Sequence, residues 1–295
     1  MGTDDRHHGH GHSHGHSHDD GFDWEAMADS LELDALMVLP LMADVINGLA
    51  AKGEWRVRHV LDVGCGPGVM SVALAGHARS ALITALDTSE PLLARTRARA
   101  KALDGRVRTV QADLDGELPD LDPADFVWAS MVLHHVADPA ATLTRLRDCL
   151  VPGGTLAMAE FAGPPAVLPA DDPLLYDGVW GRLEAAAGRV IRERLGLDPW
   201  ALDWPVLLAE AGYTDIEERT RAAFHEAPLH TDGRRWIAKH INRGLSMVGE
   251  QMAAADVEAL QQLADSAAGR RDLFVRAERR VLLARRPRAG DAPLT

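Results

Sequence analysis

The chain has 295 residues, with 31 Lys and Arg against 44 Asp and Glu, so its formal net charge is −13. This balance argues against a nucleic-acid-binding protein, because such proteins need a clustered basic surface and no basic run occurs in the sequence. No apolar stretch approaches the roughly 20 residues of a membrane helix, and the N-terminus is polar. The two cysteines give no disulfide framework, so we expect a cytoplasmic protein that spans no membrane.

Histidine is the unusual residue of the composition, and half of the histidines lie at the N-terminus. In residues 1–20 they alternate with glycine and serine, and nothing there could be buried in a core, so the segment is predicted to be a disordered tail. Neutral imidazoles bind Ni²⁺, Zn²⁺ and Cu²⁺, which leaves two interpretations, metal buffering or incidental metal binding. These residues are His7, His8, His10, His12, His14, His16 and His18.

Residues 21–55 are predicted to be helical. Apolar residues recur at spacings of three and four from Phe22 to Leu49. This periodicity indicates one or two amphipathic helices that end near Ala51, with Pro40 as the junction.

Residues 56–160 alternate short apolar runs with helical segments. This alternation predicts a doubly wound α/β fold, in which helices cover both faces of a mostly parallel sheet. In such sheets the ligand lies beyond the carboxyl ends of the strands, near the point where the strand order reverses. The predicted strands are Val57–Val63, Ala81–Asp87, Val107–Ala112, Asp125–Ser130 and Thr155–Glu160.

Residues 161–286 are predicted to complete the same domain, and residues 287–295 form a second tail. The segment contains a Pro- and Ala-rich linker, further helices, two strands and, between the strands, a helical insertion. The insertion would provide either one wall of the site or a contact in a homodimer. In chain order these elements are the linker 161–172, helices at 174–195 and 204–211, a strand at 216–224, the insertion 234–267 and a strand at 273–284.

The most informative segment joins the first predicted strand to a glycine-rich turn and then a helix. A turn of this kind lets the backbone approach a ligand closely at a helix N-terminus. The glycines are Gly64, Gly66 and Gly68, so the third lies one position earlier than in the dinucleotide fingerprint G-x-G-x-x-G. That shift argues against NAD or FAD.

Three carboxylates lie around this turn. Asp87 ends the second strand, where a carboxylate can accept hydrogen bonds from both ribose hydroxyls. Asp113 ends the third strand, and Asp62 lies just before the glycines, separated from Gly64 by Val63, where it would repel a pyrophosphate but suits a ligand with an amino group. The constellation favours a nucleoside that carries a positive charge.

Five ordered motifs resemble the class I S-adenosylmethionine-dependent methyltransferases, in their small-molecule branch. Leu61-Asp-Val-Gly-Cys-Gly-Pro-Gly68 resembles the first motif of that family, Leu86–Ser89 the ribose-binding motif and Gln111–Leu114 the adenine-binding motif. Ala129–Val136 resembles the fourth-strand motif, and Leu150–Thr155 the turn before the fifth strand. The resemblance implies a seven-stranded Rossmann-like sheet with an antiparallel final strand, and S-adenosylmethionine as cofactor.

The resemblance also assigns residues to the cofactor. The glycines would face its methionine part, Asp87 the ribose, and Asp113 with Leu114 the adenine. Cys65 is expected to be a small residue tolerated beside the cofactor and not a nucleophile. The full set of expected cofactor residues is Asp62, Gly64, Cys65, Gly66, Gly68, Asp87, Thr88, Asp113, Leu114 and Ser130.

Candidates for catalysis follow the fourth strand. His134 and His135 lie where the methyl group would be, so either could be a general base, or the pair could order the loop against the cofactor. Tyr176 could donate a hydrogen bond in the pocket or belong to the core. In the resembling family an N-terminal helix commonly closes over the cofactor, so residues 21–55 would form a lid. The substrate-side candidates are Trp24, Glu25, Met27, Trp180 and Trp236.

The sequence therefore predicts a methyltransferase that acts on a small metabolite, with an aromatic or heterocyclic compound as a candidate, at oxygen, nitrogen or electron-rich carbon. Two alternatives remain open. One is a Ni²⁺- or Zn²⁺-binding protein that has the fold without the chemistry, and the other is a nicotinamide oxidoreductase.

Overall fold

The computed structural model describes residues 24–288 and 290. The predicted tail over residues 1–20 lies outside the described residues, as does most of the predicted tail over 287–295.

Within the described residues, seven strands form one sheet in the order β3-β2-β1-β4-β5-β7-β6. The strands from β1 to β5 pair in parallel, and β7 runs antiparallel to both β5 and β6. The prediction of a doubly wound sheet with an antiparallel final strand is confirmed. The strands are β1 His59–Val63, β2 Leu82–Asp87, β3 Val107–Gln111, β4 Ala124–Ser130, β5 Leu150–Phe161, β6 Thr214–His225 and β7 Val275–Arg285.

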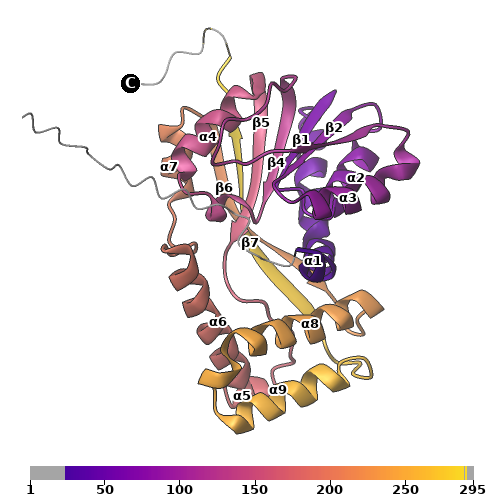
Figure 1. Cartoon of the computed structure of the whole chain (residues 1–295), viewed down its shortest axis with the longest axis vertical. Coiled ribbons are helices and arrows are strands. Elements are labelled where there is room, and N and C mark those ends of the chain that lie inside the picture. The colour runs from indigo at the N-terminus through magenta and orange to yellow at the C-terminus, as the bar shows by residue number, and fades with distance from the viewer. Residues whose placement is uncertain (1–23, 289, 291–295) are drawn as a thin grey trace, which may run out of the picture.

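Helices cover both faces of the sheet (Figure 1). One face packs against α1 Trp24–Ala51, α2 Val69–His77 and α3 Glu90–Arg99, and the other against α4 Pro139–Asp148 and α7 Trp204–Glu210. The strands β1, β2, β4 and β5 are largely buried because both faces are covered, which explains why they were recognisable as continuous apolar runs.

A helical cap lies beyond the carboxyl ends of the parallel strands, at the lower end of Figure 1. We use the word cap for four helices, which pack on one another and on α1. They arise from two places in the chain, one before β6 and one between β6 and β7. The helices are α5 Pro173–Tyr176, α6 Val179–Leu195, α8 Thr231–Val248 and α9 Ala254–Ser266.

The structure refines two expectations about the helices. Residues 24–51 form one continuous helix, and Pro40 lies inside it on the exposed side instead of dividing it. The predicted helix over 174–195 is divided at Gly178, whose φ of +73° suits glycine and ends α5 before α6 begins. The insertion packs on α1 and α6 of its own chain, so it forms a wall of the cap.

The helix α1 is also the described segment that is long and apolar enough to cross a membrane by length and composition, over Met27–Ala51. The sequence expectation missed it, because charged residues interrupt its apolar run. Its apolar side, which includes Leu33, Met37, Leu41 and Ile46, is buried in the core against the sheet.

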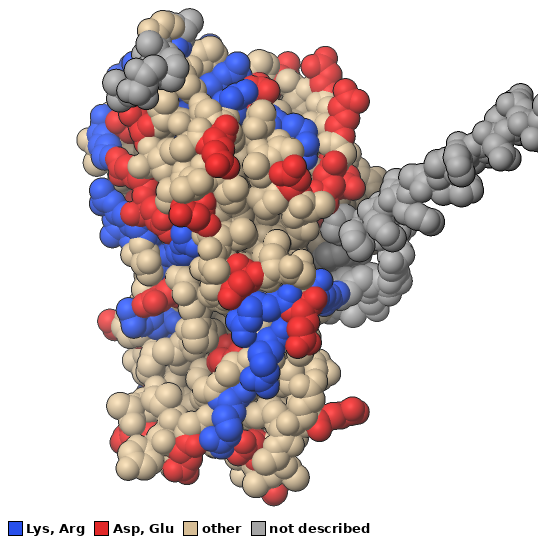
Figure 2. Space-filling view, turned by 90° about the vertical axis from the view of Figure 1, so that its left-hand side faces the viewer, with Lys and Arg blue, Asp and Glu red and all other residues tan. Residues whose placement is uncertain are grey.

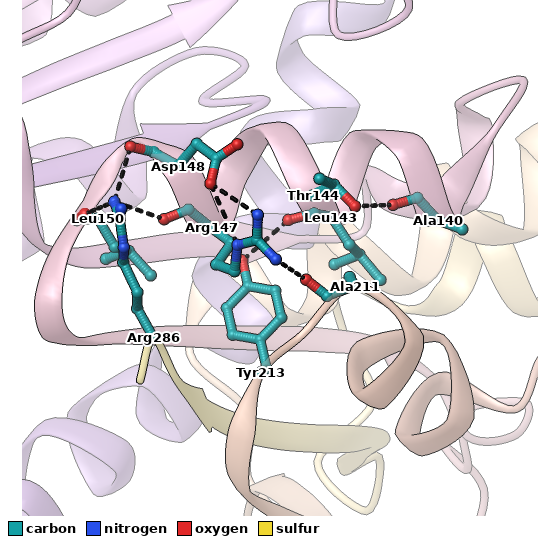
Figure 3. A network of polar contacts seen from close by, with 9 residues as sticks. All are labelled: Ala140, Leu143, Thr144, Arg147, Asp148, Leu150, Ala211, Tyr213 and Arg286. Carbon is teal, nitrogen blue, oxygen red and sulfur yellow. Dashed lines mark hydrogen bonds and ion pairs between the residues drawn. The ribbon is translucent and has the colours of Figure 1, made fainter. Parts of the chain in front are cut away.

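At the amino-terminal end of the parallel strands, a polar network ties α4 to the segment between α7 and β6 (Figure 3). The Tyr213 hydroxyl donates to the carbonyl of Leu143 at 3.1 Å. Arg147 donates to the Ala211 carbonyl at 2.6 Å and pairs with Asp148. This network lies at the opposite end of the sheet from the cap, so it stabilises the framework away from the predicted ligand site.

Candidate active site

The glycine turn joins β1 to α2 at the carboxyl edge of the sheet. All three glycines have positive φ, from +52° to +77°, which non-glycine residues rarely adopt. A Cβ on Gly64 would meet Val132 at 2.4 Å, and one on Gly68 would meet Thr96 at 2.6 Å. A Cβ on Gly66 would meet nothing within 4 Å. Two glycines therefore allow close packing within the protein, while Gly66 leaves backbone open to a ligand.

Asp87 holds the turn next to the end of β2. Its Oδ2 accepts a hydrogen bond from the Gly66 amide at 2.9 Å, and its Oδ1 accepts one from the Ser89 amide at 2.9 Å. Burial raises the pKa of Asp87, although the amides of Ser89 and Gly66 act in the opposite direction. Each oxygen retains a further lone pair, so a diol could donate to the same carboxylate.

Asp62 lies beneath the turn and is almost completely buried. The Ser71 hydroxyl donates to its Oδ2. Burial raises the pKa of Asp62 to about 7, and the negative charge of Asp87 adds to this effect. A cationic group placed beside Asp62 would favour its ionised form.

The remaining cofactor candidates follow β2, β3 and β4 at the same edge. Asp113 is exposed and accepts a hydrogen bond from the Asp115 amide, while Leu114 is buried. Thr88 and Ser130 are partly buried. Burial raises the pKa of the Cys65 thiol, so Cys65 is held as a neutral thiol, which is unsuited to nucleophilic attack.

His134 forms a buried pair with Glu160. The Nδ1 atom of His134 lies 2.6 Å from Oε2 of Glu160, and both side chains are almost fully buried. Glu160 also accepts hydrogen bonds from the amides of Val132 and Leu133 through Oε1. A carboxylate at the end of β5 therefore fixes the loop after β4 and orients the imidazole.

Sequence reasoning missed Glu160, although it ends an apolar strand at the edge where ligands bind. His135 lies on the outside of the same loop and is exposed, with its ring 4.1 Å from that of His134. Met131 lies between β4 and the two histidines and has a φ of +56°. This conformation costs energy for a non-glycine residue and often marks functional sites.

The helix α1 lies beside the glycine turn. Arg99 on α3 donates to the Pro67 carbonyl at 3.0 Å and pairs with Glu32 of α1 at 2.6 Å. Met27, one of the expected lid residues, is partly buried on this helix. The side chains of Trp24 and Glu25 are outside the described part of the structure.

Asp34 connects α1 to the cap. Its carboxylate accepts hydrogen bonds from Trp236 Nε1 at 2.7 Å and from Arg243 at 2.8 Å, both on α8. The ring of Trp236 stacks on His240, as does that of Trp180. The two tryptophans predicted on the substrate side are thus buried at the junction of α1, α6 and α8.

Tyr176 does not lie at this edge. It ends the short helix α5 at the far end of the cap and is 85% exposed. An interior position was expected because the flanking sequence is apolar, but Leu174 and Val179 face the interior while the tyrosine ring projects outward.

These residues fit S-adenosylmethionine. Gly66 leaves open space at the turn, Asp87 presents unused acceptor positions for a ribose, and Asp62 is a buried carboxylate suited to an amino group. The strand order, the glycine turn and the acidic residue at the end of β2 define the class I S-adenosylmethionine-dependent methyltransferases.

Comparison with known proteins gives the same class. Residues 60–154 match the family model described as a methyltransferase domain, so this part of the chain is a methyltransferase domain and the expected family is confirmed. An uncharacterised methyltransferase of Mycobacterium bovis is 39% identical over 122 residues, which cover 41% of this chain and 55% of that protein. A trans-aconitate 2-methyltransferase of an Acidovorax species is 40% identical over 101 residues, 34% of this chain and 37% of that protein.

Among solved structures, the YcgJ protein of Bacillus subtilis superposes with a TM-score of 0.50 at 14% identity, covering 83% of this chain and 98% of that one. This likeness concerns the fold. The chain spans about half the length of the Mycobacterium relative and less of the Acidovorax one, and both alignments are confined to a minority of this chain.

Proposed function

We propose that the whole chain is an S-adenosylmethionine-dependent methyltransferase that acts on a small metabolite. The observation that carries the proposal is the coupling of the glycine turn to Asp87, through the 2.9 Å hydrogen bond from the Gly66 amide. This coupling supports the proposal, because the open backbone at Gly66 and the carboxylate of Asp87, which would accept from a ribose, lie at the switch point of the sheet. The acceptor atom is an oxygen, a nitrogen or an electron-rich carbon.

The cofactor would supply a methyl group that is already activated by its sulfonium. The chain then has to align the acceptor and exclude water, and alignment alone can contribute roughly 7–11 kcal/mol. The helix α1 and the cap cover the carboxyl edge and can serve both purposes (Figure 1). Asp87 and Asp62 would hold the cofactor, and the turn would let it approach the backbone.

His134 is the residue best placed to accept a proton from the acceptor. It follows β4 at the carboxyl edge, and Glu160 holds its Nδ1 side. A carboxylate on one ring nitrogen fixes the tautomer and leaves the other nitrogen for a substrate proton. If the methyl acceptor loses no proton, His134 would not act as a base and would only hold the shape of the loop after β4.

Calorimetry with S-adenosylhomocysteine tests the proposal. We expect micromolar binding that Asp87→Ala weakens by at least about tenfold, because the variant loses a charged hydrogen-bond acceptor for the ribose. Exposed Asp148→Ala, at the opposite end of the sheet, is the matched control and should bind as the wild type does. Absence of binding at high micromolar ligand, or equal affinity in Asp87→Ala, would contradict the proposal.

The partner expected for such a protein is a small molecule, in the cytoplasm. The face of the molecule in Figure 2 shows acidic and basic side chains mixed in small groups, with one short band of basic side chains in its lower half. A surface of this kind suits a small metabolite better than a polyanion.

The two alternative functions, metal binding and nicotinamide oxidoreduction, have less support. The metal-binding hypothesis depends on histidines of residues 1–20, and the nicotinamide hypothesis conflicts with the position of Gly68. A titration with NADH in the presence and absence of S-adenosylhomocysteine would separate the latter from the proposed function.

A further inference from the structure

Arg279 lies on β7 at the carboxyl edge of the sheet, on the cap side. It pairs in the sheet with Phe161, the last residue of β5, so their side chains lie on the same face. The ring of Phe161 lies 4.7 Å from that of His134 and 4.8 Å from that of Trp200. Arg279 is therefore a near neighbour of the groups that would surround a methyl acceptor.

The guanidinium of Arg279 is incompletely bonded. Its Nη1 donates to the Glu278 carbonyl at 2.7 Å, while its Nε is buried and has no hydrogen-bond partner among the described residues. A buried donor without a partner costs roughly 1–3 kcal/mol. Burial lowers the pKa of this guanidinium, against the opposing effects of Asp34 and Glu160, but arginine remains charged in proteins.

The two carboxylates that act electrostatically on Arg279, Asp34 and Glu160, are bound to other groups. Asp34 accepts from Trp236 and Arg243 of α8, and Glu160 is bonded to His134 and to two loop amides. Neither forms an ion pair with Arg279 in the described part of the chain. Both carboxylates thus attract the positive charge of Arg279 from a distance, but neither contacts it directly.

We infer that Arg279 binds a carboxylate of the methyl acceptor. A carboxylate is the natural partner of a guanidinium whose Nε–H has no acceptor, because the two planar groups match in geometry. The flat ring of Phe161, the residue that pairs with Arg279 in the sheet, favours a planar acid. This inference rests on the proposed function and adds the substrate class to it. The carboxylate serves as an anchor, and the atom that receives the methyl group lies elsewhere on the acceptor.

The anchor also fits the charges of the reaction. The proposed methyl donor brings a positive sulfonium to this edge, where Arg279 already carries a positive charge. An acceptor with a carboxylate would reduce the repulsion between these two positive charges.

Two probes of nearly equal shape test the inference, 4-bromobenzoate and its neutral analogue 4-bromobenzamide. Each is titrated calorimetrically into the full chain saturated with S-adenosylhomocysteine. We expect the acid to bind at least about tenfold more tightly than the amide, in line with a charged hydrogen bond. Arg279→Gln should remove this preference, and Arg279→Lys, which keeps the charge, should retain part of it.

Arg276→Gln is the matched control. It removes the same charge from the same strand, but Arg276 is exposed and paired with Glu278, so the preference for the acid should persist. Equal affinity for acid and amide in the wild type, no binding of either probe at 10 mM, or an unchanged preference in Arg279→Gln would overturn the inference. If S-adenosylhomocysteine binds in the same samples, these outcomes contradict the inference about Arg279 and not the proposed function. If S-adenosylhomocysteine does not bind to the wild type, the proposed function itself is contradicted.

Discussion

Asp62 is a buried acid whose charge state is expected to change when the site is filled. Burial raises its pKa to about 7, so below pH 7 the free protein holds this carboxyl largely protonated. A ligand amino group would favour the ionised form and release the proton. We therefore expect the affinity for S-adenosylhomocysteine to rise with pH between 5.5 and 7, by up to about tenfold per pH unit, and to level off above.

Calorimetry in buffers of different ionisation enthalpy checks this expectation, because proton release appears as a dependence of the observed heat on the buffer. Asp62→Asn cannot ionise, so it should show neither the slope nor the released proton. An affinity that is constant from pH 5.5 to 7 in the wild type would show that Asp62 does not interact with the charged part of the ligand.

Glu160 has three bonding partners, and its replacement by Gln tests how far it organises the loop after β4. Glutamine offers one acceptor oxygen where the carboxylate offers two, and its amide would face the His134 ring. We expect Glu160→Gln to lower the free energy of unfolding by roughly 2 kcal/mol, measured by urea denaturation. Exposed Glu193→Gln on α6 should leave it within about 0.5 kcal/mol.

Nitrogen NMR of the histidines separates orientation from stability in this variant. In the wild type, His134 should carry its proton on Nδ1, which faces Glu160. A wild-type His134 protonated on Nε2 alone would contradict the orienting role of Glu160, whatever the stability of the variant.

At the scale of elements, Asp34 ties α1 to the cap. Burial raises the pKa of its carboxyl, but Arg243 and Trp236 outweigh burial and keep it below the ordinary value. Asp34→Ala would leave Arg243 and Trp236 without their acceptor, and because the side chains of Asp34 and Arg243 are 31% and 30% exposed, we expect a loss of roughly 2 kcal/mol. This contribution is present at neutral pH and is lost as the pH falls through the lowered pKa of Asp34.

Hydrogen exchange should locate that loss. Faster exchange is expected in α1 and α8 of Asp34→Ala, with little change in β1 and β4. Asp29→Ala, on the same helix, removes an exposed carboxylate paired with Arg95 and should cost less than about 1 kcal/mol. Comparable losses in the two variants would show that the partly buried link between Asp34 and Arg243 is no stronger than a surface ion pair.

The elements of the sheet were predictable because each has a local signal. The runs of β1, β2 and β4 are apolar over the length of a buried strand, and the glycine turn follows β1 directly. Pro40 misled the prediction because an exposed proline can be accommodated within a long helix whose other side is fixed by packing.

The partners of the site residues were not predictable, since they lie far apart in the chain. Asp34 and Trp236 are separated by 202 positions, and His134 and Glu160 by 26 across two strands. Neither separation produces a periodic pattern in the sequence from which the contact could be predicted. The same holds for Arg279, one of several arginines on β7, whose face is determined by the register with β5.

At the scale of the whole molecule, the two ends of the sheet have separate tasks. The carboxyl end carries the glycine turn, the acidic residues and the His134–Glu160 pair, and the cap and α1 cover it (Figure 1). The opposite end is fastened by Tyr213, Arg147 and Arg286 (Figure 3). The proposed chemistry therefore depends on one end, and changes at the other should affect stability and leave ligand affinity intact.

Removal of residues 2–20 tests whether the histidine-rich segment belongs to the same function. Seven interleaved imidazoles can bind Ni²⁺, whereas the contacts proposed for the cofactor all lie between Asp62 and Ser130. We expect the truncated chain to lose Ni²⁺ binding in calorimetry while its affinity for S-adenosylhomocysteine stays within about twofold and its melting temperature within a few degrees. A version with all seven histidines replaced by Ser is the control for the length of the segment. If the Ser version or the truncation weakened S-adenosylhomocysteine binding by about tenfold or more, the segment would be part of the methyltransferase site, and the metal and cofactor functions would have to be considered together.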